Sequence, residues 1–181
     1  MREHAAALIA IGEEPKLVKT LADLNSVSGL ILPGGESTTI QKLAGIFGLF
    51  EPICDKIQAG LPVFGTCAGL ILLADEITDG IVGQKTFGGL DVTVRRNAFG
   101  HQADSFEVDL EFSGVEGLVH AAFIRAPLIE AVGPKANVLA SLSDGRVVGV
   151  QQQNLLGISF HPEVTNEHRI HELFAKIVRV N

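Results

Sequence analysis

The chain has 181 residues, 46% of them hydrophobic, which is enough for one well-filled domain and short for two. Its 14 basic and 21 acidic residues give a formal net charge of −7, which argues against a nucleic-acid partner. No apolar stretch reaches the roughly 18 to 20 residues of a membrane span, and the first residues do not resemble a secretory signal. We therefore expect a single cytoplasmic domain over residues 1–181 that acts on a small molecule or a protein.

The first half of the chain alternates helical patterns with short apolar runs. We predict helices over residues 3–11, 38–47 and 49–59, and strands over residues 15–18, 29–32 and 62–65. Such alternation predicts a parallel sheet covered by helices on both faces. Ligands of these sheets bind beyond the carboxyl ends of the strands, where the turn Pro33-Gly34-Gly35 and the glycine Gly65 fall.

The second half has shorter runs in which apolar and polar residues often alternate. Strands are predicted over residues 90–95, 105–110, 121–124, 138–141, 147–151 and 156–160, and a helix from about residue 166 to 178. Residues 143–146, with the sequence Ser-Asp-Gly-Arg, are a hairpin signal. The predicted fold is α/β with three layers, a mostly parallel central sheet flanked by helices and an antiparallel extension.

The pentapeptide Gly-Thr-Cys-Ala-Gly at residues 65–69 follows an apolar strand and precedes a predicted helix over residues 70–74. A Gly-x-Cys-x-Gly turn in this context is typical of a nucleophile elbow, which holds a reactive side chain in a strained backbone conformation. The positive end of the following helix favours the thiolate of Cys67. Since a disulfide scaffold is not expected in a cytosolic chain with only Cys54 and Cys67, at least one thiol is free for chemistry.

The tripeptide His161-Pro162-Glu163 directly follows the last predicted strand. On an extended backbone, residues two apart point to the same side, so Glu163 can accept from one ring nitrogen of His161 while the other faces Cys67. Nucleophile, base and orienting carboxylate are the three roles of an acyl-transfer site. Alone, Cys67 could be a small core residue and the His-Pro-Glu segment a turn. Their joint occurrence at strand ends favours catalysis.

Histidines elsewhere raise the question of a metal. His168 and His171 lie three residues apart on the last predicted helix, a spacing that a zinc site can use. No cluster of cysteines or carboxylates completes such a site in the sequence. We therefore expect no metal, and the absence of a phosphate-binding loop or another cofactor motif predicts no cofactor.

These motifs carry a family resemblance. The Cys67 pentapeptide and the His161 tripeptide resemble those of the class I, triad-type glutamine amidotransferases, which have a flavodoxin-like fold. Four further motifs resemble the glutaminase subunits of pyridoxal 5′-phosphate synthase: LPGGESTT at residues 32–39, RNAFG at 96–100, DSFE at 104–107 and FIRAP at 123–127. The motifs recur in order along essentially the whole chain.

The resemblance implies a role for each matching residue. The catalytic triad would be Cys67, His161 and Glu163, and the backbone N–H groups of Gly35 and Ala68 would form the oxyanion hole. Glutamine would be bound by residues from three of the motifs, namely Gly35, Glu36, Ser37, Arg96, Ile124 and Arg125. Arginine suits a carboxylate because its fork bonds both oxygens, although both arginines could equally be surface charges.

The resemblance also implies the reaction and the partner. L-glutamine would be hydrolysed to glutamate and ammonia through a thioester. The ammonia would pass to the synthase subunit of pyridoxal 5′-phosphate synthase, a (β/α)8 barrel, in a hetero-oligomer. Three alternatives stay open from the residues: an amidotransferase serving a different synthase, a cysteine hydrolase or stress protein with the same elbow, and a noncatalytic binding or regulatory subunit of the same complex.

The sequence departs from the family at its first residues. Family members carry an apolar strand and a Gln-Gly-containing turn just before the Arg-Glu-His segment, whereas here Arg2-Glu3-His4 follows Met1. The first strand of the family is therefore expected to be missing. Loss of an interior strand would leave two neighbours with unpaired backbone groups. Either the natural protein starts further upstream, or the remaining sheet has closed up or paired with another chain.

Overall fold

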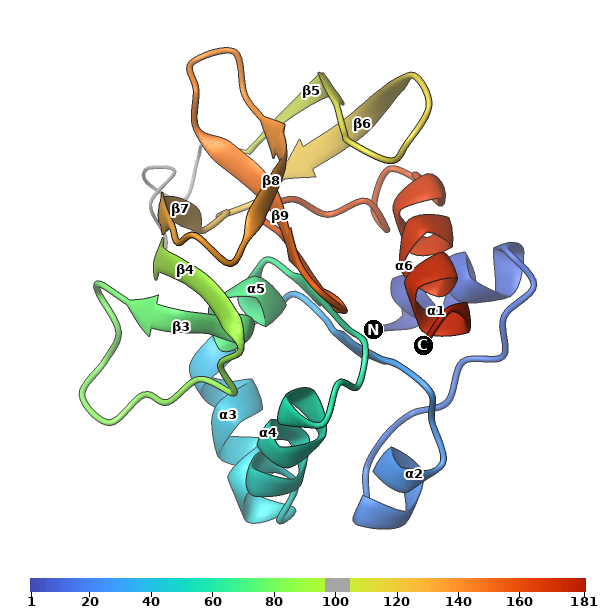
Figure 1. The fold of residues 1–181 in the computed structure, drawn as a ribbon, viewed down its shortest axis with the longest axis vertical. Coiled ribbons are helices and arrows are strands. Elements are labelled where there is room, and N and C mark those ends of the chain that lie inside the picture. Colours follow the sequence, from blue (N-terminus) through green and yellow to red (C-terminus); the bar gives the residue numbers. More distant parts are fainter. Residues whose placement is uncertain (97–104) are drawn as a thin grey trace.

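The computed structural model describes residues 1–96 and 105–181 of the chain (Figure 1). Its helices are α1 (Arg2–Ala10), α2 (Leu21–Asn25), α3 (Ser37–Ile46), α4 (Phe50–Gln58), α5 (Ala68–Leu73) and α6 (Arg169–Arg179). Its strands are β1 (Leu30–Leu32), β2 (Val63–Thr66), β3 (Ala74–Ile77), β4 (Leu90–Arg95), β5 (Phe106–Glu111), β6 (Leu118–Phe123), β7 (Leu128–Val132), β8 (Asn137–Ser141), β9 (Val147–Gln152) and β10 (Leu155–Ile158).

The central sheet runs in the order β1-β2-β10-β9-β7-β4-β3, and β8 pairs with β9. The pairs β1/β2, β2/β10 and β3/β4 are parallel, while the pairs that include β9 or β7 are antiparallel. Strands β5 and β6 form a separate antiparallel pair. The predicted three-layer α/β fold with an antiparallel extension is confirmed. Among the described residues the central sheet is mixed and curled and not mostly parallel, since three of its strand pairs are parallel and four are antiparallel (Figure 1).

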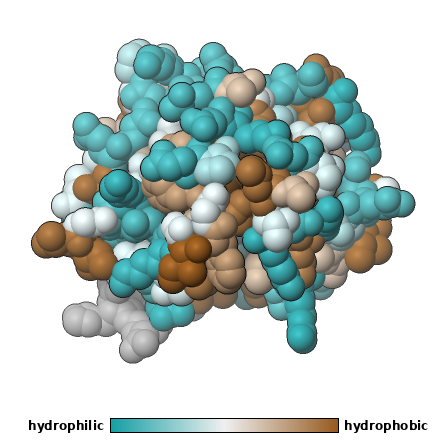
Figure 2. All heavy atoms as spheres, turned by 90° about the horizontal axis from the view of Figure 1, so that it is seen from below, coloured by the Kyte–Doolittle hydropathy of each residue, from teal (hydrophilic) through white to brown (hydrophobic). Residues whose placement is uncertain are grey.

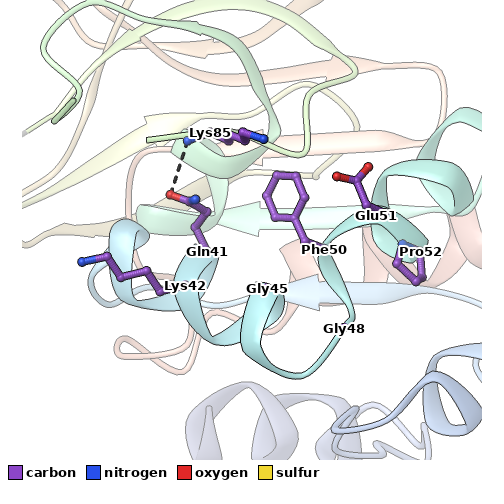
Figure 3. Close-up of a pocket in the computed structure, with 8 residues that line it drawn as sticks. All are labelled: Gln41, Lys42, Gly45, Gly48, Phe50, Glu51, Pro52 and Lys85. Atoms are coloured by element: carbon purple, nitrogen blue, oxygen red, sulfur yellow. Dashed lines mark hydrogen bonds between the residues drawn. The ribbon is translucent and has the colours of Figure 1, made fainter. Parts of the chain in front are cut away.

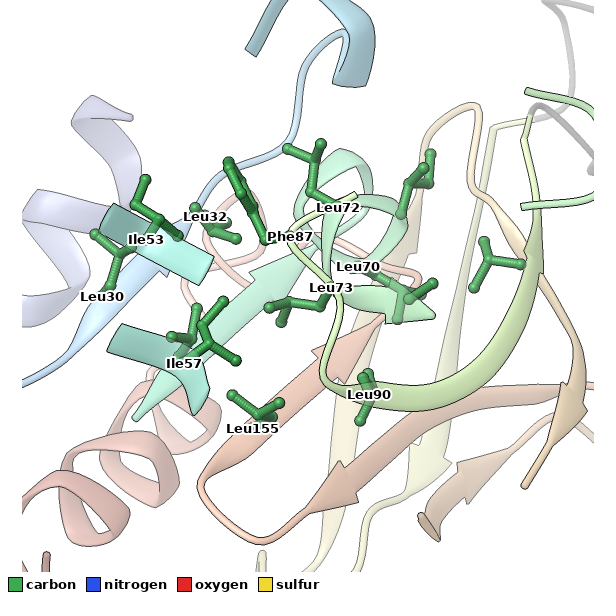
Figure 4. Packing of buried hydrophobic residues seen from close by; sticks show 14 of the residues in the cluster. Leu30, Leu32, Ile53, Ile57, Leu70, Leu72, Leu73, Phe87, Leu90 and Leu155 are labelled. Atoms are coloured by element: carbon green, nitrogen blue, oxygen red, sulfur yellow. The ribbon is translucent and has the colours of Figure 1, made fainter. Parts of the chain in front are cut away.

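Two apolar clusters cover the two faces of the sheet. The first joins the sheet to α3, α4 and α5, and includes Ile53, Leu72 and Leu90 (Figure 4). The second joins the other face to α6 and to the β5/β6 pair, and includes Phe64 and Phe174. Neighbouring residues Val63 and Phe64 of β2 belong to different clusters, as the two-residue period of a strand requires. Because both faces are covered, every residue of β2 and β10 is buried.

One prediction for the segment before β1 is wrong, and one helix there was missed. Residues 15–18 form no strand, because no neighbouring strand pairs with them, and an unpaired strand is not stable. The segment instead leads into α2, whose start is capped: the Thr20 side chain accepts from the Asp23 N–H, and the Asp23 carboxylate accepts from the Thr20 N–H. Thr20-x-x-Asp23 is the sequence signal that would have identified this helix.

The arrangement of β1 bears on the expected loss of the family's first strand. In the described part of the chain, β1 lies at an edge of the sheet and pairs on one side only, with β2. Strands β1, β2 and β10 are continuous neighbours, so the sheet has no interior gap at this position. At this end of the sheet, the backbone groups without a partner strand among the described residues are those on the free edge of β1.

Most other predicted elements lie within a few residues of their observed positions. The hairpin signal is confirmed between β8 and β9, where Leu142 N–H donates to the Arg146 carbonyl at 2.8 Å. Strands β3 and β7 were missed, and the predicted strand over 121–124 corresponds to the longer β6. No helix in residues 1–96 and 105–181 is long and apolar enough to cross a membrane.

The surface near α2, α3 and α4 mixes hydrophilic and hydrophobic side chains, as the view from below shows (Figure 2). Three apolar side chains near the end of α3, Leu43, Ile46 and Phe47, are 46%, 76% and 63% exposed. The predicted site residues of this helix are at its opposite end.

Candidate active site

Cys67 lies in the turn between β2 and α5, with φ 50° and ψ −102°. A positive φ in a residue other than glycine is uncommon and strained. The turn is held because Cys67 N–H donates to the Ile158 carbonyl of β10 at 2.9 Å. The residue is 7% exposed, and its sulfur is a free thiol. The backbone of this turn is that of a nucleophile elbow, as the sequence predicts.

The glycines on either side of Cys67 allow the close contacts of the elbow. A Cβ on Gly65 would lie 2.5 Å from the carbonyl carbon of Gly69, and a Cβ on Gly69 would lie 2.0 Å from the carbonyl oxygen of Leu32. No side chain fits at either position without moving backbone. The glycines thus bring β1, β2 and α5 together at the carboxyl ends of the two strands.

His161 and Glu163 follow β10, which is the parallel neighbour of β2. His161 N–H donates to the Ala122 carbonyl of β6 at 2.8 Å, which fixes the backbone of this segment. The His161 Nδ1 atom lies 2.8 Å from Glu163 Oε1, and the two side chains are 13% and 8% exposed. The ring nitrogen Nε2 is left for Cys67. The structure therefore brings together the three residues that the sequence predicts as a triad.

The electrostatics of this group favour a charged histidine. Burial lowers the pKa of His161, but hydrogen bonds to Cys67 and Glu163, together with their charges, raise it to about 10. Burial raises the pKa of Glu163, whereas the hydrogen bond from His161 and the nearby ring of His4 lower it overall. A protonated imidazole between a sulfur and a carboxylate can stabilise a thiolate and later donate a proton to a leaving group.

The turn after β1 packs directly against the histidine. A Cβ on Gly34 would lie 2.4 Å from His161 Cε1, so this position has no room for a side chain. Gly35 has φ +138°, a conformation that other residues rarely adopt. Ala68 is the first residue of α5, where backbone N–H groups have no partner within the helix. Both predicted oxyanion donors thus lie on segments next to the triad.

Hydrogen bonds connect Arg96 directly to Glu36 and, through Gln84, to Ser37. Arg96 Nη2 donates to Glu36 Oε1 at 2.8 Å, and Arg96 Nη1 donates to Gln84 Oε1 at 2.7 Å. Gln84 Nε2 donates to Ser37 Oγ at 3.0 Å. Sequence reasoning missed Gln84, because a single glutamine in a loop carries no local signal for this bridge.

Glu36 also caps α3. Its carboxylate accepts from the backbone N–H groups of Thr38 and Thr39, at 3.3 and 2.8 Å, and from both threonine hydroxyls. Burial opposes ionisation of Glu36, but these hydrogen bonds outweigh it and lower its pKa to about 2. The folded state therefore gains stability from the ionised carboxylate.

This cap predicts a pH-dependent loss of stability in Glu36→Ala. Since the folded pKa lies below the ordinary value of 4.5, the stabilisation is present above pH 4.5 and is lost as pH falls toward 2. The side chain is 50% exposed, so solvent screens it, and we expect a cost of about 1 kcal/mol near neutral pH, as for other helix caps. Urea unfolding between pH 7 and pH 3 measures the difference, with Glu14→Ala, an exposed glutamate, as the control. A difference that does not shrink at low pH would contradict this assignment.

Ile124 and Arg125 follow β6 at the strand end beside His161. Arg125 is exposed and has φ 47°, the second strained non-glycine residue at this edge. Residues 97–100 and Asp104, which belong to two of the motifs, lie outside the described residues.

The last two residues of interest are buried histidines that the sequence did not place in the site. His4 of α1 and His171 of α6 face each other, with 2.9 Å between His4 Nδ1 and His171 Nε2. His171 thus pairs with His4 and not with His168, and no group of three possible metal ligands occurs among residues 1–96 and 105–181. The signal for His4 would have been a histidine on the buried face of the first helix.

A separate groove of about 360 Å³ lies between α3, α4 and the loop before β4 (Figure 3). The Lys85 N–H donates to Gln41 Oε1 across it at 3.3 Å. It contains none of the predicted site residues, because they lie at the N-terminal end of α3 and the groove lies along its later turns.

The chain is similar to known proteins along nearly its whole length. The family model described as the SNO glutamine amidotransferase family matches residues 1–180. A protein of Leifsonia xyli subsp. xyli named pyridoxal 5′-phosphate synthase subunit PdxT is 56% identical over 176 residues, which cover 96% of this chain and 88% of that protein. The protein of the same name from Streptomyces coelicolor is 52% identical over 182 residues, with 100% and 90% covered.

Solved structures have a fold similar to that of this chain. The crystal structure of a glutamine amidotransferase superposes with a TM-score of 0.92 at 45% identity, covering 98% of this chain and 93% of that one. PurLQS from Thermotoga maritima superposes with a TM-score of 0.72 at 19% identity, covering 97% and 91%, and shares the fold.

Proposed function

The chain belongs to the SNO glutamine amidotransferase family, and on that basis we propose that it is the glutaminase subunit of a pyridoxal 5′-phosphate synthase. It hydrolyses L-glutamine to L-glutamate and delivers the ammonia to a synthase subunit for vitamin B6 biosynthesis. The observation that carries the proposal is the strained cysteine of the elbow beside a buried His161–Glu163 pair.

The first half of the proposed reaction forms a thioester. The Cys67 thiolate attacks the side-chain amide carbon of glutamine, so a C–S bond forms and the carbonyl electrons move to oxygen. When this tetrahedral intermediate collapses, the C–N bond breaks, and the His161 imidazolium donates its proton to the leaving nitrogen. Ammonia leaves, and the γ-glutamyl group stays on Cys67.

The second half regenerates the enzyme. His161, now neutral, accepts a proton from water as the water attacks the thioester carbon. The C–S bond breaks, glutamate leaves and the thiolate returns. Glu163 keeps His161 in one tautomer and orientation throughout, because its Oε1 atom accepts from Nδ1.

Backbone donors stabilise the oxyanion in both halves. We assign this role to the N–H groups of Ala68, at the start of α5, and of Gly35, in the turn after β1. Removing one such donor costs about 3 to 4 kcal/mol of barrier in comparable sites.

Residues around the turn bind the amino-acid end of glutamine. We assign glutamine binding to Gly35, Glu36, Ser37, Arg96, Ile124 and Arg125. The Arg96 guanidinium is already connected to Glu36 and, through Gln84, to Ser37, so these side chains are ordered before substrate enters. Such order reduces the entropy lost on binding.

The proposal also includes a cellular location and a partner protein. Two free cysteines fit a reducing compartment, and we place the enzyme in the cytoplasm as a single domain over residues 1–181. The synthase subunit receives the ammonia through a shielded path, since free ammonia in water is protonated and lost.

Titration of the synthase subunit into a glutamine hydrolysis assay tests the partnership. We expect glutamate release to be slow for the chain alone and to rise severalfold until the synthase saturates it, because binding energy of the partner can complete the site. Serum albumin at the same concentrations is the control. A flat response to the synthase would overturn the partner assignment, and absence of glutamate release in both conditions would overturn the activity.

A further inference from the structure

We propose that His4 is a positioning residue for the hydrolysis of glutamine: it holds Glu163 of the triad and Thr66, the residue before Cys67, in a fixed relation. This inference rests on the proposed function. It concerns a residue of α1 that lies far in sequence from both the elbow and the histidine segment.

The geometry places one ring nitrogen of His4 between two parts of the site. Its Nε2 atom lies 3.1 Å from Thr66 Oγ1 and 3.4 Å from Glu163 Oε1. The opposite nitrogen, Nδ1, lies 2.9 Å from His171 Nε2. The His4 side chain is 5% exposed and packs edge-on against Phe64 of β2. His4 is thereby fixed by α6 on one side and contacts the site on the other.

Among the described residues, the Glu163 side chain has few polar partners, namely His161, His4 and its own backbone N–H. Its Oε1 atom faces both His161 Nδ1 and His4 Nε2, at 2.8 and 3.4 Å. Its other oxygen, Oε2, is buried and has no hydrogen-bond partner among the described residues. A buried carboxylate with so few donors is costly to keep ionised, so each donor matters.

The protons of the two buried histidines can be assigned from their surroundings. Burial lowers the pKa of His4 against the effect of Glu163, and burial together with His4 lowers the pKa of His171 to about 4. Both rings are therefore neutral at pH 7, with one N–H each. We assign the His4 proton to Nε2, which faces the carboxylate, and the His171 proton to Nε2, which then donates to His4 Nδ1.

The resulting hydrogen bonds run in one direction toward the triad. His171 donates to His4, His4 donates to Thr66 with the Glu163 carboxylate 3.4 Å from the same nitrogen, and His161 donates to Glu163. Loss of the His4 N–H would remove its polar contact with Glu163 and would free the side chain of Thr66. Among the described residues, the hydrogen-bond, ion-pair and ring partners of His4 are His171, Thr66, Glu163 and Phe64, so its effect should fall on the chemical steps and not on substrate binding.

Two substitutions at His4 separate positioning from packing. His4→Leu removes both ring nitrogens but keeps an apolar side chain, whereas His4→Gln carries an amide nitrogen that reaches the position of Nε2. The control is His120→Leu on β6, since His120 is half exposed and, within residues 1–96 and 105–181, its ring bonds to Glu107 and Asp109. For each we would measure kcat and KM for glutamine with the synthase, the melting temperature, and the rate of Cys67 alkylation by iodoacetamide from pH 6 to 9.

We expect His4→Leu to lower kcat about tenfold with KM unchanged, as small displacements of catalytic groups do. His4→Gln should recover most of kcat, and His120→Leu should match the wild type. Alkylation of Cys67, followed by peptide mass to distinguish it from Cys54, should be slower in His4→Leu near neutral pH. Wild-type kcat and alkylation in His4→Leu would overturn the proposal. The proposal would also be overturned if His4→Leu and His4→Gln lost kcat equally and in proportion to their fall in melting temperature.

Failure of the proposed function gives a different pattern. If the wild type releases no glutamate even with the synthase, the activity is wrong, but alkylation still reports on the triad. Slower alkylation in His4→Leu than in His4→Gln would then support positioning by His4, and identical alkylation rates would overturn it.

Discussion

Substitution of Cys67 by serine is expected to lower glutamine hydrolysis by about 10⁴-fold or more, as loss of the nucleophile does in other triad enzymes. The hydroxyl of serine is a far weaker nucleophile than the thiolate of Cys67, which is hydrogen-bonded to His161. The fold should be retained, because serine differs from cysteine by one atom and the strained turn is held by the Ile158 carbonyl. Glutamate release at saturating synthase measures the loss.

Cys54→Ser is the matched control for that experiment. Cys54 lies on α4, is partly buried and packs against the first apolar cluster, away from the elbow. It should leave glutamate release at the wild-type rate. If Cys67→Ser kept more than a few per cent of the activity, the thioester route would be wrong.

Gly34→Ala should lower kcat by about 100-fold although it adds only a methyl group. The new Cβ would lie 2.4 Å from Cε1 of His161, so the ring must move away from Cys67 or the turn must shift. Backbone strain does not contribute, because Gly34 is not among the residues with positive φ. Steady-state kinetics with the synthase, with circular dichroism to confirm folding, measure the effect.

Gly45→Ala provides the control for an added methyl group. Gly45 lies on the exposed side of α3, and a Cβ there meets nothing within 4 Å. This variant should keep full activity and gain about 0.5 to 1 kcal/mol of stability, since alanine favours a helix over glycine. Equal activity of Gly34→Ala and Gly45→Ala would mean that the turn after β1 does not contact His161 in its catalytic conformation.

Local sequence patterns correctly predicted the elements whose limits are set by residues within the same segment. The apolar run before Cys67 and the hairpin at residues 143–146 each combine an element with its own stop signal, and both are observed. The strand at residues 15–18 was wrong because a strand needs a partner, which a local pattern cannot supply. Strand β3 was missed because it follows α5 without a break, so that no turn residue separates the two.

The residues of the candidate site also divide into those that a local motif identifies and those that only the folded chain brings together. Cys67, His161 and Glu163 stood out because each lies in a short motif at a strand end, although their roles stay predictions. His4 could not be recognised, since its partners lie 62 and 167 residues away along the chain. Gln84 was missed for the same reason, because its contacts with Ser37 and Arg96 arise only when the loop folds over α3.

The most direct test of the central claim is the mass of the protein after incubation with 6-diazo-5-oxo-L-norleucine, a diazoketone analogue of glutamine, in the presence of the synthase. A glutaminase with Cys67 as nucleophile should gain one adduct per chain, located on the peptide that contains Cys67, and glutamine should slow its formation. A noncatalytic binding subunit would bind without reacting. Folded protein that gains no adduct on Cys67 would contradict the account.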